Sequence, residues 1–475
     1  MCRVWANLAA AIALAVAVEG CRAARQVRDP DYSVVVSAGY QAAESPTPQA
    51  EAVPPILARL AGPQPVEVYI EHALAQNPET EAARKRVDAM AGRVPQAASL
   101  SDPMVSLMGF PFYPAVPQTA GGRVTTAVSA SQQVPWLGKL RTKAESAEAE
   151  TDAARAQLAA AELAVVEQVK RAYYDLYAVE KAIHITEEDR ALLLDLARVA
   201  EARDRTGKVS QQDVLRAQVE VSSLDGELIR MRQEFTSART RLAQLLHVSP
   251  DTPVGAVERL SGEEIPRDVQ RLYEVAVAAR PELQAQLATI RRDRRQVELA
   301  RLAYYPDFNF TVDWTAMTTS KAMAPTADGI DDVGIGVMLN VPIYRKRLAA
   351  GVREAEAQTV ADARQYDSLR DGTVQQVKDL FVQVTSQEEL IKLFRDDIIP
   401  RADQTLRASM TAYEAGSTDF LQLVDNWRQL LRFRIAFHRL EAQLRQALAS
   451  LERVAGGQLA RRVGPEAGPE APKDE

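Results

Sequence analysis

The chain of 475 residues has few cysteines and few aromatic side chains. Its two cysteines, Cys2 and Cys21, both lie near the N-terminus, so the rest of the chain can form neither a disulfide framework nor a cysteine metal site. Aromatic residues make up only 6%, while Ala, Glu, Arg, Gln and Leu fill the central stretches, as in long helices and coiled coils. The net charge of −7 is mild, and no basic surface for nucleic acid is indicated.

Recognisable catalytic and metal-binding arrangements are also missing from the sequence. We find no nucleophile beside a base, no phosphate loop and no catalytic acid pair, so we expect neither an enzyme nor a cofactor. Met104 and Met108 could touch a soft ion, but we favour flexible apolar filler. The histidines are scattered, and none pairs at helical spacing with another ligand of a recognisable metal site: His72, His184, His247 and His438.

The N-terminus contains one apolar run, Leu8–Val18, which is too short for the roughly 20 residues that span a bilayer. It predicts a cleaved export signal over residues 1–21. The run ends in Glu19-Gly20-Cys21, which resembles a bacterial lipoprotein cleavage box, with Glu19 as a departure. Lipidation of Cys21 and a simple secretory signal are therefore two open alternatives. Residues 22–65 form a low-complexity linker, and residues 456–475 a polar tail that we expect to be disordered.

Glycine and proline are absent from residues 139–206, a stretch of 68 residues. Apolar residues recur there at helical spacing, and one helix of that length would be about 100 Å long. Residues 347–415 are similar, although Pro400 should kink the helix. Both stretches end at a glycine and return as helices near 209–246 and 418–454, which predicts two long antiparallel helical hairpins.

The two hairpins belong to an internal repeat. Pro78 and Pro281 open equivalent helical stretches 203 residues apart, and Val134-Pro135 matches Val341-Pro342. We predict a mainly α fold with membrane β, in two tandem repeats over residues 66–255 and 256–455. Each repeat has the order helix, strand, strand, long helical hairpin. The predicted strands cover about 103–112, 123–134, 306–316 and 332–341.

Two of these strands alternate cleanly between apolar and polar residues. A length of nine or ten residues suits a tilted transmembrane β-strand, whereas a half-buried strand of a soluble sheet is the alternative. On the membrane interpretation the apolar set faces lipid: Phe308, Phe310, Val312, Trp314, Ile335, Val337 and Leu339.

Four strands cannot close a barrel, and an open sheet edge is not tolerated in a bilayer because its backbone groups would lack partners. A barrel with an aqueous lumen needs more than about eight strands. Three chains supply twelve, so the strand count predicts a homotrimer with a 12-stranded barrel.

Over residues 66–454 the chain resembles the TolC-type outer-membrane efflux channel family. The resemblance is carried by the repeated helix openings at 77–79 and 280–282, the Y-Y-P-D at 304–307, the Q-V-P-W-L-G-K-L-R at 133–141 with its echo at 340–348, and the hairpin turns at 206–215 and 413–425. The S-D-P-M at 101–104 followed by Q-V-P-W-L-G-K-L-R is most similar to the subgroup that serves heavy-metal RND exporters.

The resemblance implies a passive outer-membrane exit duct, in which the 12-stranded barrel of the homotrimer is continued by an α-helical barrel that extends into the periplasm. It would carry substrates, among them heavy-metal cations, from an inner-membrane RND-type pump and a periplasmic adaptor (membrane fusion protein), and it would contact outer-membrane lipid. Two alternatives stay open. One is a periplasmic coiled-coil scaffold or adaptor lipoprotein, and the other is a type I protein-secretion channel.

By family position, the hairpin turns carry a gate. Asp425 matches an acidic ring position, which would place three carboxylates around the pore, and Gln422 departs from the second such position. Asp213 and Tyr413 match positions that lock the tip, Thr418 stands where some members carry a locking Arg, and Asp419 is a further pore candidate. A solvated helix face is the alternative for each charge. The residues expected at the hairpin tips, for turns and adaptor docking, are Gly207, Lys208, Gly416, Ser417 and Thr418.

Trp136 and Tyr344 lie where a strand gives way to a helix. Anchoring at the membrane interface, where Trp and Tyr are enriched, and packing at the junction are equally compatible with their positions.

Overall fold

The computed structural model describes residues 60, 62–110, 117–205, 211–260 and 265–457, together with residues 31, 32 and 35. The chain divides into two compact units, Met1–Ala58 and Arg59–Glu475, and the description below concerns the second. The predicted signal with Cys21, nearly all of the linker, the turn at 206–210 with Gly207 and Lys208, and the tail beyond residue 457 lie outside the described residues.

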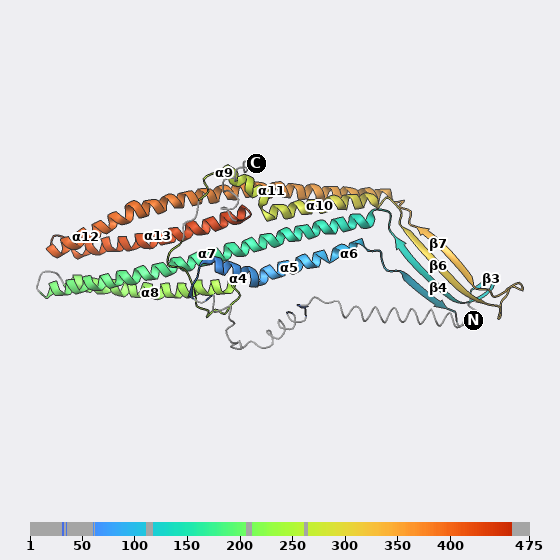
Figure 1. Ribbon diagram of the computed structural model, residues 1–475, viewed down its shortest axis with the longest axis horizontal. Helices are drawn as coiled ribbons and strands as arrows, with labels where there is room; N and C mark the ends of the chain where they lie inside the picture. The colour runs from blue at the N-terminus through green and yellow to red at the C-terminus, as the bar shows by residue number, and fades with distance from the viewer. Residues whose placement is uncertain are drawn as a thin grey trace, which may run out of the picture. The chain divides into compact units, whose positions relative to one another are not determined.

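Two long helical hairpins dominate this unit (Figure 1). In the first, α7 (Lys139–Asp204) is a single helix of 66 residues, and α8 (Gln211–Leu245) returns beside it. In the second, α11 (Arg345–Leu393) continues through a short π-helix, η1 (Phe394–Ile398), into α12 (Ile399–Ala415), and α13 (Phe420–Val454) returns. α7 occurs where the absence of glycine and proline predicts it, and the second rod contains Gly351, Gly372 and Pro400.

Pro400 explains why the second rod is interrupted. Its ring cannot donate a backbone hydrogen bond and crowds the carbonyl of the preceding turn. The backbone responds by widening into η1 directly before the proline, which then occupies the first turn of α12. A π-helical turn is a known way to absorb such a conflict inside an α-helix, so the predicted kink takes this form.

Each half of the unit begins with shorter helices. They are α4 (Val66–Gln76), α5 (Pro78–Ala91) and α6 (Arg93–Ala98) in the first half, and α9 (Val269–Ala279) and α10 (Pro281–Leu302) in the second. We predicted six helices and did not expect α4 and α9. They end because Asn77 and Arg280 precede a proline and take extended backbone conformations, after which Pro78 and Pro281 start the next helix.

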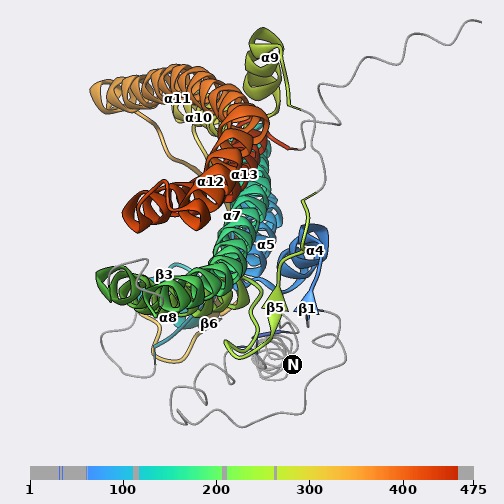
Figure 2. The same ribbon diagram turned by 90° about the vertical axis from the view of Figure 1, so that its left-hand side faces the viewer.

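The helices pack side by side in a curved row, as Figure 2 shows from the end. α7 packs against α5, α8, α10 and α13, and α10 also packs against α11. α4 and α9 lie on the outer side of the row. There β1 (Gly62–Pro63) pairs in parallel with β5 (Val254–Gly255), and the Tyr69 hydroxyl donates to the Gly255 carbonyl at 3.0 Å. Among the described helices, none is both long and apolar enough to cross a membrane.

An antiparallel sheet lies at one end of the helices (Figure 1). Its strands β2 (Met104–Gly109), β4 (Gly122–Val134), β6 (Phe308–Thr318) and β7 (Asp332–Leu339) follow in that order across the sheet, and the short β3 (Gln118–Thr119) pairs with β4. β6 and β7 lie where the clean alternation predicts them, and β2 and β4 lie within or close to the ranges that the repeat predicts. β2 and β7 are the outer strands of the path, and each pairs along one side only.

Candidate functional site

The register of the sheet collects apolar side chains on one face. Val312 lies opposite Ala130 on one side and Ile335 on the other, and Phe310 lies opposite Val337. Directly opposite residues of an antiparallel pair share a face. The seven residues predicted to face lipid therefore lie on one side of the sheet, where Ile335 is 84% exposed.

The opposite face of the sheet is polar. Ser129 lies opposite Asp313, Ser131 opposite Thr311, and Gln133 opposite Asn309. Met104 and Met108 share this face with them, through their register with β4, and both are exposed. One face of the sheet is thus suited to an apolar surrounding and the other to water.

The connection from sheet to helices is built around Trp136 and Asp307. The indole ring of Trp136 stacks on Tyr305 at 5.2 Å and on Phe308 at 5.7 Å between ring centroids. Its backbone N–H donates to Asp307 Oδ1 at 2.8 Å, and Lys139 Nζ donates to the same oxygen at 2.7 Å. Trp136 thus packs at the junction.

Tyr344, at the equivalent connection of the second half, behaves differently. Its side chain is 70% exposed, which leaves interfacial anchoring open for Tyr344.

At the far end of the helices, the second hairpin turn is closed by a Schellman motif. Gly416 takes a left-handed conformation with φ of +80°, its N–H donates to the Tyr413 carbonyl, and the Ser417 N–H donates to the Ala412 carbonyl. Gly416 is a turn residue because a side chain there would be strained.

Asp419 caps the next helix. Its carboxylate accepts from the Gln422 backbone N–H at 2.9 Å, which satisfies one of the free amides at the start of α13. The Thr418 hydroxyl donates to the Gln422 side chain at 3.0 Å. The local role of Asp419 and Thr418 is to build the turn, and neither contact involves Asp425.

Tyr413, Arg203 and Asp213 come together beneath this turn. Tyr413 is buried, and Arg203 donates to its carbonyl oxygen and lies over its ring, with Cζ 4.9 Å from the centroid. Burial raises the pKa of Tyr413, the negative charge of Asp213 raises it further, and Arg203 opposes both. Among the described residues, the Tyr413 hydroxyl has no hydrogen-bond partner. Arg203 of α7 thus contacts the C-terminal end of α12 directly beneath the turn.

Asp425 is exposed and forms an ion pair with Arg428, one helical turn away, at 3.3 Å. Arg428 is held more firmly by Glu220 of α8, with which it makes two hydrogen bonds. The sequence analysis missed Arg428, although its spacing of three residues from Asp425 is a usable signal. Asp425 therefore carries its charge at the surface with a cation beside it.

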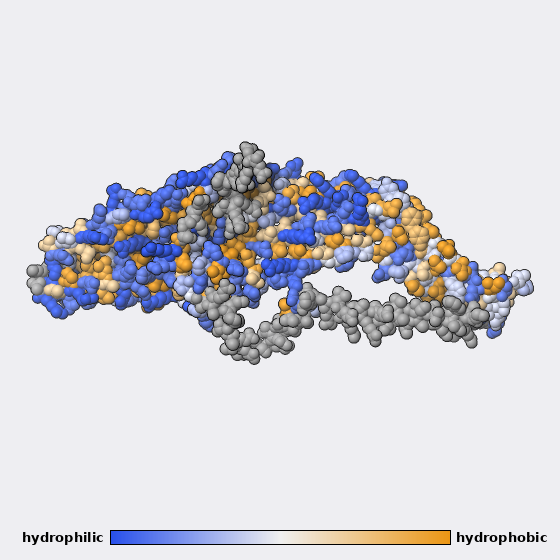
Figure 3. Space-filling model, in the orientation of Figure 1, coloured by the Kyte–Doolittle hydropathy of each residue, from blue (hydrophilic) through white to orange (hydrophobic). Residues whose placement is uncertain are grey.

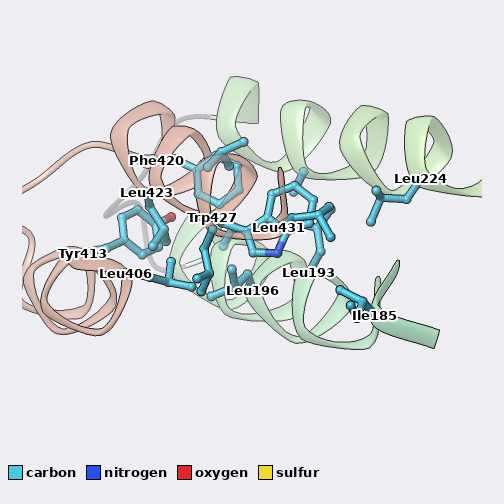
Figure 4. Packing of buried hydrophobic residues seen from close by; sticks show 14 residues of the cluster. Ile185, Leu193, Leu196, Leu224, Leu406, Tyr413, Phe420, Leu423, Trp427 and Leu431 are labelled. Carbon is cyan, nitrogen blue, oxygen red and sulfur yellow. The ribbon is translucent and has the colours of Figure 1, made fainter. Parts of the chain in front are cut away.

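A buried apolar cluster supports the turn from below (Figure 4). Leu193 and Leu196 of α7, Leu406 and Tyr413 of α12, and Phe420, Leu423 and Trp427 of α13 belong to it. Asp189 of α7 reaches this cluster with only 2% of its surface exposed. Its Oδ1 accepts from Trp427 Nε1 at 3.0 Å, and its Oδ2 lies 3.8 Å from Arg434. Burial raises the pKa of Asp189, which Arg434 and Trp427 only partly offset.

The contact between α7 and α13 carries polar pairs along its length. Burial opposes ionisation of Glu167, but hydrogen bonds from Ser450 and Arg453 outweigh it and lower the pKa of Glu167. The interface thus contrasts with the apolar packing under the turn. Its pairs, written α7 residue first, are Glu167–Arg453, Lys170–Glu452, Asp175–Gln446, Tyr177–Glu441 and Asp189–Trp427.

No cluster of three His, Cys, Asp or Glu side chains that could hold a metal occurs in the part of the chain that the structure describes. His184 pairs with Glu188 at 3.2 Å, and His438 pairs with Glu441 at 2.8 Å, at helical spacings of four and three. Both pairs are visible in the sequence, and each is a single ion pair.

Comparison with known proteins settles the family. A profile of the family described as outer membrane efflux protein matches residues 69–247 and 272–457. The chain belongs to this family. It is 25% identical over 415 residues to the cobalt-zinc-cadmium resistance protein CzcC of Cupriavidus metallidurans, covering 85% of this chain and 93% of that one. It is 22% identical to nodulation protein T of Rhizobium leguminosarum, covering 76% of this chain and 79% of that one.

Solved structures agree on the fold. CusC superposes with a TM-score of 0.70 at 18% identity, covering 87% of this chain and 97% of that one. The outer membrane protein VceC of Vibrio cholerae gives 0.69 at 20% identity, covering 82% and 96%. The family match makes this chain an efflux protein of the outer membrane and not an enzyme.

Proposed function

We propose that three copies of this outer membrane efflux protein form one exit duct, with a shared 12-stranded barrel in the outer membrane and a helical barrel in the periplasm. The duct receives substrates from an inner-membrane RND-type pump through a periplasmic adaptor. Its two tandem repeats each contribute two strands and one long hairpin.

The observation that carries this proposal is the sheet. It has one apolar and one polar face, and its outer strands β2 and β7 each pair along one side only. A sheet with open edges is not tolerated in lipid, and edge-to-edge pairing of β7 with β2 of the next copy removes both edges. Three copies of the four-stranded path then enclose a lumen lined by the polar face.

Exposed apolar residues on two helices support the same assembly. α8 exposes Leu215, Val219 and Ile229, and α11 exposes Val382, Leu390 and Leu393. On each helix the spacing places these side chains along one face. Such stripes fit helix-to-helix contacts between copies.

We further propose that the gate lies at the hairpin turns. In a trimer Asp425 occurs three times around the axis, which would create a cation-selective ring, and Tyr413, Asp213 and Arg203 would hold the turn closed. Gly416, Ser417 and Thr418, with Gly207 and Lys208 of the other turn, would form the tips that meet the adaptor.

The cargo we propose is divalent metal cations. The support is the resemblance of this chain to CzcC, whose name states resistance to cobalt, zinc and cadmium. The polar face of the sheet suits hydrated ions, since β4 and β6 present mainly Ser, Thr, Asn, Gln and Asp side chains there. Expression in a strain that lacks its own channel for these metals, together with the matching pump and adaptor, should restore growth on zinc, cobalt or cadmium; restored growth on organic drugs alone would refute the cargo.

The assembly is tested by native mass spectrometry and planar-bilayer conductance of the full chain in detergent. We expect a trimer that produces discrete conductance steps. A monomer that stays in aqueous solution without detergent, and inserts into no bilayer, would refute the duct and favour a periplasmic scaffold.

A further inference from the structure

Both long helices that leave the sheet begin with cations. In α11 the first residues are Arg345, Lys346 and Arg347, and in α7 Arg141 and Lys143 follow Lys139. Neither helix has an acidic residue in its first turn. The start of a helix carries a partial positive charge, which favours acids there and disfavours cations. The dipoles of α7 and α11 therefore do not stabilise these cations.

Partners within the chain account for only part of this charge. Lys139 is held by Asp307, Arg141 pairs with Glu145 at 3.0 Å, and Arg345 lies over the ring of Tyr304 with Cζ 5.5 Å from its centroid. Lys346 and Arg347 are exposed, and within the described ranges neither forms an ion pair. We name Arg141, Lys143, Arg345, Lys346 and Arg347 the basic collar.

An exposed apolar rim adjoins the basic collar on the side of the sheet. Leu137 is 82% exposed, Ile343 66% and Tyr344 70%. These three residues follow β4 and β7 along the chain, and Figure 3 shows apolar surface where the sheet meets the helices. Along the chain, each apolar strand is followed within a few residues by an exposed Leu or Tyr and then by cations.

This order matches the layers of a membrane leaflet. Apolar strands suit the acyl chains, Tyr suits the interface, and cations suit anionic headgroups. We infer that the basic collar binds the headgroups of anionic phospholipids in the leaflet on the helical side of the sheet. The inference rests on the proposed membrane barrel and adds a lipid preference to it.

An acidic protein could also satisfy the charge, but it would leave the apolar rim in water. Exposed Leu137 and Ile343 lie between the strands and the cations along the chain. This order fits one partner that is apolar at one end and anionic at the other. A phospholipid has that chemistry, and a soluble acidic segment does not.

The test uses the full-length protein in vesicles of phosphatidylglycerol and phosphatidylcholine at a 1:1 ratio. Only one of the two lipids carries bromine on its acyl chains, and bromine quenches Trp136 and Trp314 when it is adjacent. Stronger quenching by the brominated anionic lipid measures its enrichment next to the protein. We expect enrichment for the wild type that falls as salt is raised, because surface charges are screened.

The variant is Lys346→Gln/Arg347→Gln. The matched control is Arg364→Gln/Arg370→Gln on exposed positions of the same helix, about 27–35 Å further from the sheet. The anionic preference at the collar should fall about fivefold per cation removed, whereas the control should keep it. Equal quenching by both lipids in the wild type, or equal loss in both variants, would overturn the lipid preference.

The same experiment separates this inference from the proposed function. Absence of quenching by either brominated lipid means that the sheet is not in the bilayer, and the barrel fails with it. Strong but equal quenching means that the barrel stands and only the collar inference fails. Native mass spectrometry of each variant confirms that the assembly is unchanged, and a lost preference in a variant that has also dissociated would be repeated with Lys346→Gln alone.

Discussion

The hydrogen bond from Trp427 to Asp189 joins the two helical hairpins, and its removal gives a sharp prediction. Trp427→Phe keeps an aromatic ring in the apolar cluster but leaves Asp189 Oδ1 without its donor. Trp427 and Asp189 are 1% and 2% exposed, so water does not replace the bond readily. A hydrogen bond to a charged group contributes about 1.5–3 kcal/mol, which corresponds to local opening that is roughly 10- to 150-fold more frequent.

The assay is amide hydrogen exchange of α13 around Trp427 in the intact protein, which reports local opening free energies. The variant should exchange faster there, while exchange of α10 stays unchanged. The second arm of the experiment is Trp427→Phe in an Asp189→Asn background, where the buried charge is gone. The effect of Trp427→Phe should be smaller in that background, because a neutral acceptor is less costly to leave unpaired.

The contribution of Asp189 to the stability of the folded protein should depend on pH in a definite direction. Burial raises the pKa of Asp189 above its unfolded value of about 3.9, so the folded protein binds this proton more tightly than the unfolded chain. The contribution of Asp189 to stability is therefore greatest below the unfolded pKa and falls as the pH rises through the folded pKa. Asp189→Asn should remove this dependence. An equal loss of protection from Trp427→Phe in both backgrounds would refute the reasoning and leave packing alone as the cause.

Three further predictions concern the turn, the gate and the sheet. Gly416→Val should destabilise the hairpin turn by about 1–2 kcal/mol, because a branched side chain is strained in the left-handed conformation. Amide hydrogen exchange at the start of α13 should become faster, and unchanged exchange would show that the turn does not require glycine. Asp425→Ala should reduce the preference for cations in planar bilayers, although Arg428 beside it already offsets part of the charge, and unchanged selectivity would exclude Asp425 from the gate. Val312→Arg should weaken membrane insertion by about 2–4 kcal/mol, measured as trimer yield in outer membranes, whereas the neighbouring Thr311→Arg on the opposite face should be tolerated; equal effects would contradict the assignment of the two faces.

The sequence is most informative where one local rule acts without competition. The 68 residues without glycine or proline predict α7 to within two residues at its C-terminus, because nothing in that stretch can end a helix. β6 and β7 follow from alternation, which places the seven residues predicted to face lipid on one face of the sheet. In both cases the local pattern alone determines the structure.

The sequence is least informative where the outcome depends on which helices meet. Nothing local to Asp189 or Trp427 reveals that they touch, since they are 238 residues apart. Arg203 is one of several cations near the first turn, and only the packing of α7 beside α12 and α13 selects it. The π-helix before Pro400 was predicted only as a kink, because a proline fixes where a helix must adapt and leaves open how.

The uneven construction of the two hairpins has a mechanical consequence. α7 is one uninterrupted cylinder of hydrogen bonds, so a bending load on its tip is spread along 66 residues. The second arm has a wider turn at Phe394–Ile398 and a missing backbone donor at Pro400, so the same load concentrates at one joint. The chain thus combines a stiff helix, α7, with a second arm that bends at η1. We expect a movement of the hairpin tips to occur by bending of the second arm.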